Sequence, residues 1–216
     1  MRNVYPRWAN FKPRAQGLIP AKGGVTGNRM TTIDLRLATE ADVPAVRELM
    51  DRAIGQLQRE FLSPAQIAAS RAVMGLDTQL IADRTYFLAT IDGALAGCGG
   101  WSARATLYGG DHSGDLRDAR LLDPAREPAR IRAMFTDPAF ARRGVGRAIL
   151  AACERAAAAA GFREAEMMAT LAGEPLYRAC GYGAVERTAA APVDGVAVPL
   201  VRMAKPLAPE GPALPA

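Results

Sequence analysis

The chain has 216 residues, a length that suits one compact domain, and a formal net charge of +5 from 27 Lys and Arg against 22 Asp and Glu. Six of the basic residues and none of the acidic ones lie in residues 1–30, which leaves 21 basic against 22 acidic residues in the rest. The body therefore lacks the basic surplus of a nucleic-acid-binding protein. No apolar run is long enough to span a bilayer. We expect neither nucleic acid nor a membrane as a partner.

The first predicted elements follow from hydrophobic periodicity. Alternation of apolar and polar residues predicts a strand over residues 32–37. Thr39 is a typical N-cap for a helix, and Ser63-Pro64 begins a second helix because proline is tolerated at the first helical position. Asp92-Gly93 is a hairpin signal between strands 85–91 and 94–103.

Residues 104–128 form a long connection rich in Gly, Asp and Pro, of a kind that is usually functional or disordered. Beyond it the pattern again alternates between strand and helix. This order of elements predicts a mixed α/β fold and is too rich in strands for a helical bundle. The expected elements are strand 130–137, helix 144–160, strand 164–170, a short helix 174–180 and strands near 183–188 and 195–203.

The two ends of the chain differ from this body. Residues 1–30 have no hydrophobic periodicity and are expected to be a disordered basic leader. Residues 204–216 contain four prolines and are expected to be a disordered tail. Residues 31–203 would then form a single domain. The three cysteines lack metal-ligand spacing, so we expect no metal site, and reduced thiols in a cytoplasmic protein.

A basic, glycine-containing loop follows strand 130–137 and reads Ala-Arg-Arg-Gly-Val-Gly-Arg over residues 141–147. Gly144 and Gly146 allow the backbone to approach a ligand closely, and the first amides of the next helix have no intrahelical acceptor. Arginine side chains in the loop add positive charge. The pattern predicts a phosphate-binding site at a helix N-terminus. The alternative interpretation is a glycine-containing turn with solvated arginines.

Two nucleotide-binding motifs do not fit this loop. A Walker loop needs Gly-Lys-Ser/Thr, but Arg147 follows Gly146. A dinucleotide fingerprint needs a third glycine, and Ile149 occupies that position. ATP and NAD are therefore disfavoured as ligands.

The loop resembles the Q/R-x-x-G-x-G/A motif of the GNAT superfamily of N-acetyltransferases, with Ala141 in place of the leading residue. A second family motif, Y-x-x-x-G-F/Y, is matched from Tyr177 to Tyr182. The resemblance extends over about residues 33–203. It implies a GNAT-like fold with a mixed, mostly antiparallel central sheet flanked by helices.

The resemblance also implies transfer of an acetyl group from acetyl-CoA, as co-substrate, directly to an amine of a small molecule or protein. A main-chain amide near Phe135 or Thr136 would polarise the acetyl carbonyl. Tyr177 would protonate the leaving thiolate. Thr170 stands where the family often has an asparagine that touches the pantetheine arm. The cofactor-binding residues expected on this basis are Met134, Phe135, Thr136, Arg142, Arg143, Gly144, Val145, Gly146, Arg147 and Thr170.

The sequence does not identify which residue acts as the general base. Strand 131–136 has no Asp or Glu, in contrast to family members that carry a carboxylate there. The remaining candidates are His112, the only histidine, Asp111 and Glu174. A loop histidine on the surface, a helix-capping role for Glu174 and a water chain without a dedicated base are the alternatives.

The acceptor site would be shaped by the two early helices, the 104–128 connection and the C-terminal strands. By analogy with the family, a homodimer is a candidate assembly. The alternative function is a non-catalytic acyl-CoA-binding or sensor module on the same fold. The missing strand carboxylate and Thr170 favour that alternative, and Tyr177 argues against it.

Overall fold

The computed structural model describes residues 32–208, so the predicted leader lies outside the described residues. Its centre is a seven-stranded sheet in which every neighbouring pair is antiparallel except β4 and β5. This confirms the expected mixed, mostly antiparallel sheet. In spatial order the strands are β1 (Asp34–Leu37), β2 (Tyr86–Ile91), β3 (Ala94–Ser102), β4 (Ala129–Thr136), β5 (Glu164–Thr170), β7 (Pro199–Pro206) and β6 (Gly183–Ala189).

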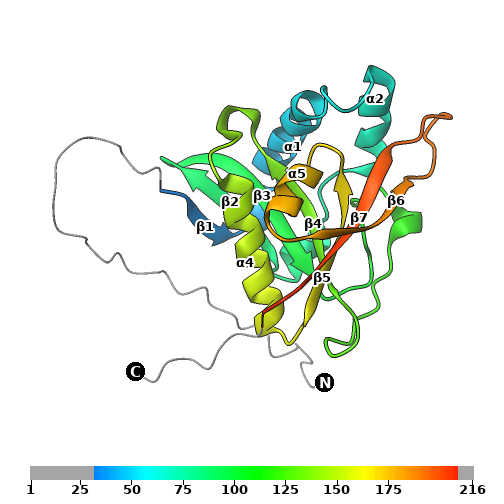
Figure 1. The fold of residues 1–216 in the computed structure, drawn as a ribbon. Coiled ribbons are helices and arrows are strands. Elements are labelled where there is room, and N and C mark those ends of the chain that lie inside the picture. Colours follow the sequence, from blue (N-terminus) through cyan, green and yellow to red (C-terminus); the bar gives the residue numbers. More distant parts are fainter. Residues whose placement is uncertain (1–31, 209–216) are drawn as a thin grey trace, which may run out of the picture.

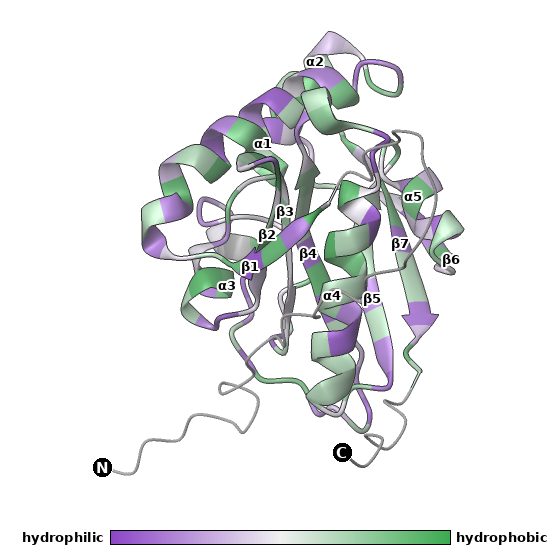
Figure 2. Cartoon of the chain, turned by 90° about the vertical axis from the view of Figure 1, so that its left-hand side faces the viewer, coloured by the Kyte–Doolittle hydropathy of each residue, from purple (hydrophilic) through white to green (hydrophobic). Residues whose placement is uncertain are grey.

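Helices cover both faces of the sheet (Figures 1 and 2). One face carries α1 (Val43–Leu57), α2 (Pro64–Val73) and α3 (Thr78–Ala82). The opposite face carries α4 (Val145–Ala159) and α5 (Glu174–Ala179). Each face has its own apolar core, so the middle of the sheet is buried between two helical layers, whereas the edge strand β6 is exposed. Three short 3-10 helices complete the described elements: η2 (Glu40–Asp42), η3 (Gly114–Leu116) and η4 (Pro138–Phe140).

Local signals in the sequence account for several boundaries. Ser63 and Gln66 form a reciprocal capping box at the start of α2, with Pro64 at the first helical position. Asp92 and Gly93 both have positive φ, as a tight hairpin turn requires. These elements lie where the sequence predicts them.

Two features differ from the sequence-based expectation. The short helix α3 was not expected; it begins after Asp77, whose side chain accepts a hydrogen bond from Gln79 N. The tail prediction is wrong for residues 204–206, because β7 continues to Pro206 and pairs with β5 there. Leu207 is buried as well. Within residues 32–208, no helix has the length and apolar character needed to cross a membrane.

Candidate active site

The two parallel strands in the middle of the sheet separate soon after they meet. β4 pairs with β5 only at Ala129–Ala165 and Arg130–Glu166. From Ile131 onward the two strands are unpaired, which leaves one edge of β4 without a strand partner. Because backbone amides need hydrogen-bond partners, such a gap is suited to a ligand that supplies them.

A cavity of about 670 Å³ occupies this region. Its lining includes the unpaired half of β4, the facing part of β5, the start of α4 and the middle of α5. The cavity also reaches past the sheet to α1 and the 104–128 connection. The sequence-predicted residues that line it are Met134, Phe135, Thr136, Arg142, Gly144, Val145, Gly146, Arg147, Thr170 and Tyr177.

Alternation along β4 decides which of its amides face the gap. The Asp137 N–H donates to Ala96 O of β3 at 2.9 Å. Successive amides in a strand point to opposite sides, so the Thr136 amide faces away from β3 and toward the gap. By the same alternation the Phe135 amide faces β3.

The predicted phosphate loop sits at the N-terminus of α4. Gly144 has φ 87°, a left-handed conformation that glycine adopts without steric cost. Gly146 is closely covered, because a Cβ there would lie 2.8 Å from Leu176 Cδ2 of α5. The absence of a side chain at Gly146 thus lets Leu176 pack against the start of α4, and both residues line the cavity.

The loop arginines are not equivalent. Arg142 and Arg147 line the cavity, whereas the Arg143 guanidinium lies over the Phe140 ring, 5.2 Å from its centroid. The start of the loop is held by Asp137, whose carboxylate accepts from Ala139 N at 2.9 Å and pairs with Arg52 of α1 at 2.8 Å. This arrangement anchors the loop to the helix layer on the other face of the sheet.

Tyr177 enters the cavity from α5. Only 8% of its surface is exposed, and its ring packs edge-on against Tyr182, with centroids 6.2 Å apart. Burial raises the pKa of the Tyr177 hydroxyl well above its ordinary value, with smaller contributions from the Cys153 and Cys180 thiols. Thr170 faces the same space, and its hydroxyl oxygen accepts from Gly173 N at 3.1 Å.

Two catalytic candidates do not lie on the cavity lining. The Glu174 carboxylate pairs with Arg178 at 2.8 Å and Arg187 at 2.7 Å, and these guanidinium groups lower its pKa. His112 packs over Gly75, with Nε2 2.8 Å from Ala72 O near the end of α2. The structure gives both side chains structural contacts and does not bring them together with Tyr177.

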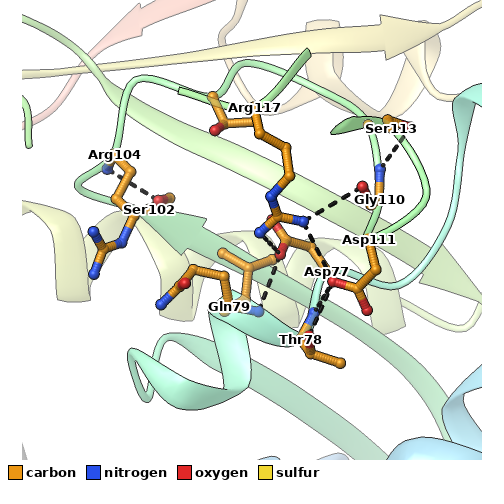
Figure 3. Close-up of polar contacts among 12 residues, drawn as sticks. Asp77, Thr78, Gln79, Ser102, Arg104, Gly110, Asp111, Ser113 and Arg117 are labelled. Carbon is orange, nitrogen blue, oxygen red and sulfur yellow. Dashed lines mark hydrogen bonds and ion pairs between the residues drawn. The ribbon is translucent and has the colours of Figure 1, made fainter. Parts of the chain in front are cut away.

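The 104–128 connection is folded against α3 (Figure 3). Arg117 donates to the buried Asp77 at 2.9 Å, and Asp111 accepts from Thr78 N at 3.0 Å. Arg132 of β4 also pairs with Asp77 and donates to Gly109 O at 2.8 Å. This network, which the sequence analysis missed, holds the connection beside the cavity, where Leu107, Tyr108 and Gly109 form part of the lining.

The far end of the cavity is mostly apolar. Phe61, which follows α1, is 42% exposed there, an unusual degree for a large aromatic side chain. Gln58 is 5% exposed; its Nε2 donates to Met74 Sδ at 3.2 Å, and its Oε1 has no hydrogen-bond partner in the described part of the chain. The other lining residues at this end include Ala53, Ile54, Leu57, Glu60, Val73, Met74 and Gly75.

The part of the chain that contains the loop and Tyr177 matches a known protein family. A model described as the acetyltransferase (GNAT) family matches residues 48–182, which include both the loop and Tyr177. No curated protein sequence matches the chain.

Solved structures with the same fold include a GCN5-related N-acetyltransferase from Rhodopseudomonas palustris, at 20% identity and a TM-score of 0.60, covering 86% of this chain and 100% of that one. The structure of yncA from Salmonella typhimurium with its cofactor acetyl-CoA has 17% identity and a TM-score of 0.53, covering 84% and 96%. The PaiA N-acetyltransferase from Thermoplasma acidophilum, in complex with coenzyme A, has 13% identity and a TM-score of 0.53, covering 81% and 99%. At these low identities the structural similarity shows the shared fold alone.

Proposed function

The chain belongs to the acetyltransferase (GNAT) family, and we propose that it transfers the acetyl group of acetyl-CoA directly to an amine. The observation that carries the proposal is the single cavity that joins the phosphate loop, the gap beside β4 and Tyr177 to an apolar end. A cofactor with a long arm needs such a continuous path, because its pyrophosphate and its thioester must be held far apart. The free cysteines Cys98, Cys153 and Cys180 support a reducing compartment such as the cytoplasm.

In this proposal the amides at the N-terminus of α4, with Arg142 and Arg147, hold the pyrophosphate. The β4 amides that face the gap, among them that of Thr136, are available to donate hydrogen bonds to the pantetheine arm and to the acetyl carbonyl oxygen as it gains negative charge. The Thr170 hydroxyl still has its own proton to donate to the pantetheine arm.

The reaction needs two proton movements. The acceptor nitrogen gives up a proton to water before or during attack on the thioester carbon, and a C–N bond replaces the C–S bond. Tyr177 donates its proton to the departing sulfur, which leaves coenzyme A as a thiol, and Tyr177 then regains a proton from solvent. Direct transfer is favoured over an acyl intermediate on Cys98, because burial raises the pKa of that thiol to about 12 and keeps it protonated.

The apolar end suggests the class of acceptor. Its walls favour an amine carried on an apolar body, such as an aromatic or aliphatic primary amine or a peptide with an apolar first residue. The unpartnered Gln58 Oε1 would accept one N–H of that amine after a small side-chain rotation.

The function is tested by measuring thiol release from acetyl-CoA with a panel of amines. The panel should contain apolar amines, polyamines and peptides with apolar or acidic first residues. Turnover that is fastest with the apolar members supports the proposal. Binding of acetyl-CoA without turnover on any amine would instead favour a sensor module.

The unequal loop arginines give a matched pair of variants. We expect Arg142→Ala to weaken coenzyme A binding about tenfold or more, because a hydrogen bond to a charged group contributes about 1.5–3 kcal/mol. Arg143→Ala, whose side chain lies over Phe140, should weaken it by less than about threefold. Isothermal titration calorimetry at fixed salt measures both. Equal losses in the two variants would contradict the assigned positions.

The pH dependence follows from the direction of the Tyr177 pKa shift. Because burial raises that pKa above its ordinary value of about 10, the acid keeps its proton throughout the neutral and mildly alkaline range. The acceptor ammonium, with a pKa near 10, loses its proton over the same range. We therefore expect kcat/KM to rise with pH up to about pH 9.5. A decrease in kcat/KM with a midpoint near neutral pH would be inconsistent with Tyr177 as the acid.

A further inference from the structure

A bulge interrupts the pairing of β3 with β4 beside the cavity. Cys98 pairs with Phe135 and Gly100 with Arg132, so two steps along β3 correspond to three along β4. Ala133 is one of the two β4 residues between these pairs, and it has φ 51°, a left-handed conformation that is uncommon for alanine. The surroundings must therefore stabilise this backbone conformation.

Tyr86 of β2 supplies one such contact. Its side chain is fully buried, and its hydroxyl donates to the carbonyl oxygen of Ala133 at 3.0 Å. The glycines of β3 make room for this arrangement. A Cβ on Gly100 would lie 2.8 Å from Tyr86 Cδ2, and one on Gly99 would overlap Met134 Sδ. The run Gly97-Cys98-Gly99-Gly100 thus permits both the tyrosine and the bulge.

The planar trans peptide links this contact to the cavity. The Ala133 carbonyl and the Met134 N–H belong to one peptide unit and point in opposite directions. Tyr86 holds the carbonyl on the side of β2 and β3, so the Met134 N–H is turned toward the other side. That side is the gap between β4 and β5, where Met134 lines the cavity.

We propose that Tyr86 is a positioning residue, whose buried hydroxyl holds the Ala133–Met134 peptide so that the Met134 N–H donates to the acetyl carbonyl. The inference rests on the proposed acetyl transfer at this site. Without the hydroxyl, the partly buried Ala133 oxygen loses the Tyr86 donor, and this contact no longer holds the peptide in its orientation. The Met134 N–H then leaves its alignment with the oxygen that becomes negative during attack.

The test replaces Tyr86 by Phe, which keeps the ring in the core. The matched control is Thr85→Val. Thr85 is the adjacent buried residue, and its hydroxyl bonds Leu80 O at 3.3 Å, away from β4. Both variants remove one hydrogen bond from the hydroxyl of a buried side chain to a backbone carbonyl, so both should lower the melting temperature by similar amounts. Only Tyr86→Phe should affect the reaction.

We expect Tyr86→Phe to lower kcat about tenfold, a fraction of the loss seen when an oxyanion donor is removed, with coenzyme A affinity unchanged. Isotope-edited infrared spectroscopy of acetyl-CoA, bound with no amine present, provides a direct readout. In the wild type the carbonyl stretch should lie below its solution frequency, and in Tyr86→Phe it should move back toward that value.

The outcomes separate this role from the function on which it rests. A wild-type protein that binds and transfers, with Tyr86→Phe equal to it in kcat and carbonyl frequency, overturns the role of Tyr86 alone. An equal loss of kcat in Thr85→Val also overturns it, because general loosening of the core would then suffice. A wild-type protein that binds no coenzyme A overturns the proposed function and this role together.

Discussion

Replacing Tyr177 by Phe should lower kcat about 100-fold, because a positioned general acid contributes about 10²–10⁴ to the rate. The ring stays in place, so its edge-on packing with Tyr182 and the shape of the cavity are retained. Affinity for coenzyme A should change by less than about threefold, since the hydroxyl acts on sulfur only as the C–S bond breaks. Steady-state kinetics and calorimetry measure the two effects.

Tyr182→Phe is the matched control for that variant. Tyr182 is buried beside Tyr177 but is not part of the cavity lining, so loss of its hydroxyl should leave kcat near the wild-type value. The acid role of Tyr177 fails if Tyr177→Phe retains full turnover, or if both variants lose the same activity. A loss of coenzyme A affinity that matches the loss of kcat would assign Tyr177 to binding instead.

The cofactor end of the site could be predicted because its determinants are local in sequence. Gly144 adopts a left-handed conformation, and the next residue begins α4, so a loop of seven residues specifies the turn and the helix start together. Tyr177 is recognisable for the same reason, since its motif lies within one short helix and the turn after it. The structure brings both motifs to one cavity.

The acceptor end could not be predicted at the level of residues. Its lining comes from α1, the segment after α2 and the 104–128 connection, which meet only when the sheet is complete. The early helices and this connection were expected to shape it, but nothing local distinguishes Phe61 or Gln58 from other residues at helix ends.

Contacts between residues far apart in the sequence also explain why two predicted catalytic residues do not line the cavity. Glu174 lies three residues before Tyr177 and is turned away by Arg187, a residue of the edge strand β6. The His112 ring contacts the carbonyl oxygen of Ala72 at the end of α2, 40 residues earlier in the chain. The sequence predicts an end of the last strand that is too early, because Pro206 is typical of a disordered tail. In the structure Lys205 still pairs with Ala165 in the sheet.

No local sequence pattern predicts the Asp77 network, because the residues that form it are far apart in the chain. Asp77 is 0% exposed and pairs with Arg132 of β4 and Arg117 of the 104–128 connection. It also caps α3. One carboxylate thus joins the sheet, a helix and the connection beside the cavity. Figure 3 shows its contacts with Gln79 and Arg117.

Asp77→Ala should destabilise the protein by about 3–5 kcal/mol, because it leaves the buried Arg132 guanidinium without its counter-charge. Burial lowers the pKa of Arg132 and Asp77 opposes that effect, so this carboxylate offsets part of the cost of burying the guanidinium. Urea denaturation at neutral pH measures the loss. Thiol release should fall with it, since the residues from Leu107 to Gly109 would no longer be held at the cavity.

Two comparisons separate this effect from the loss of any ion pair. Asp51→Ala breaks the exposed pair with Arg71, in which the Asp51 side chain is 71% exposed, and should cost less than about 1 kcal/mol. The double variant Asp77→Leu with Arg132→Met removes both buried charges and should be more stable than Asp77→Ala, because apolar replacement of a buried pair is often neutral. If Asp77→Ala costs no more than Asp51→Ala, the network does not hold the connection, and the acceptor end must be maintained by its apolar packing alone.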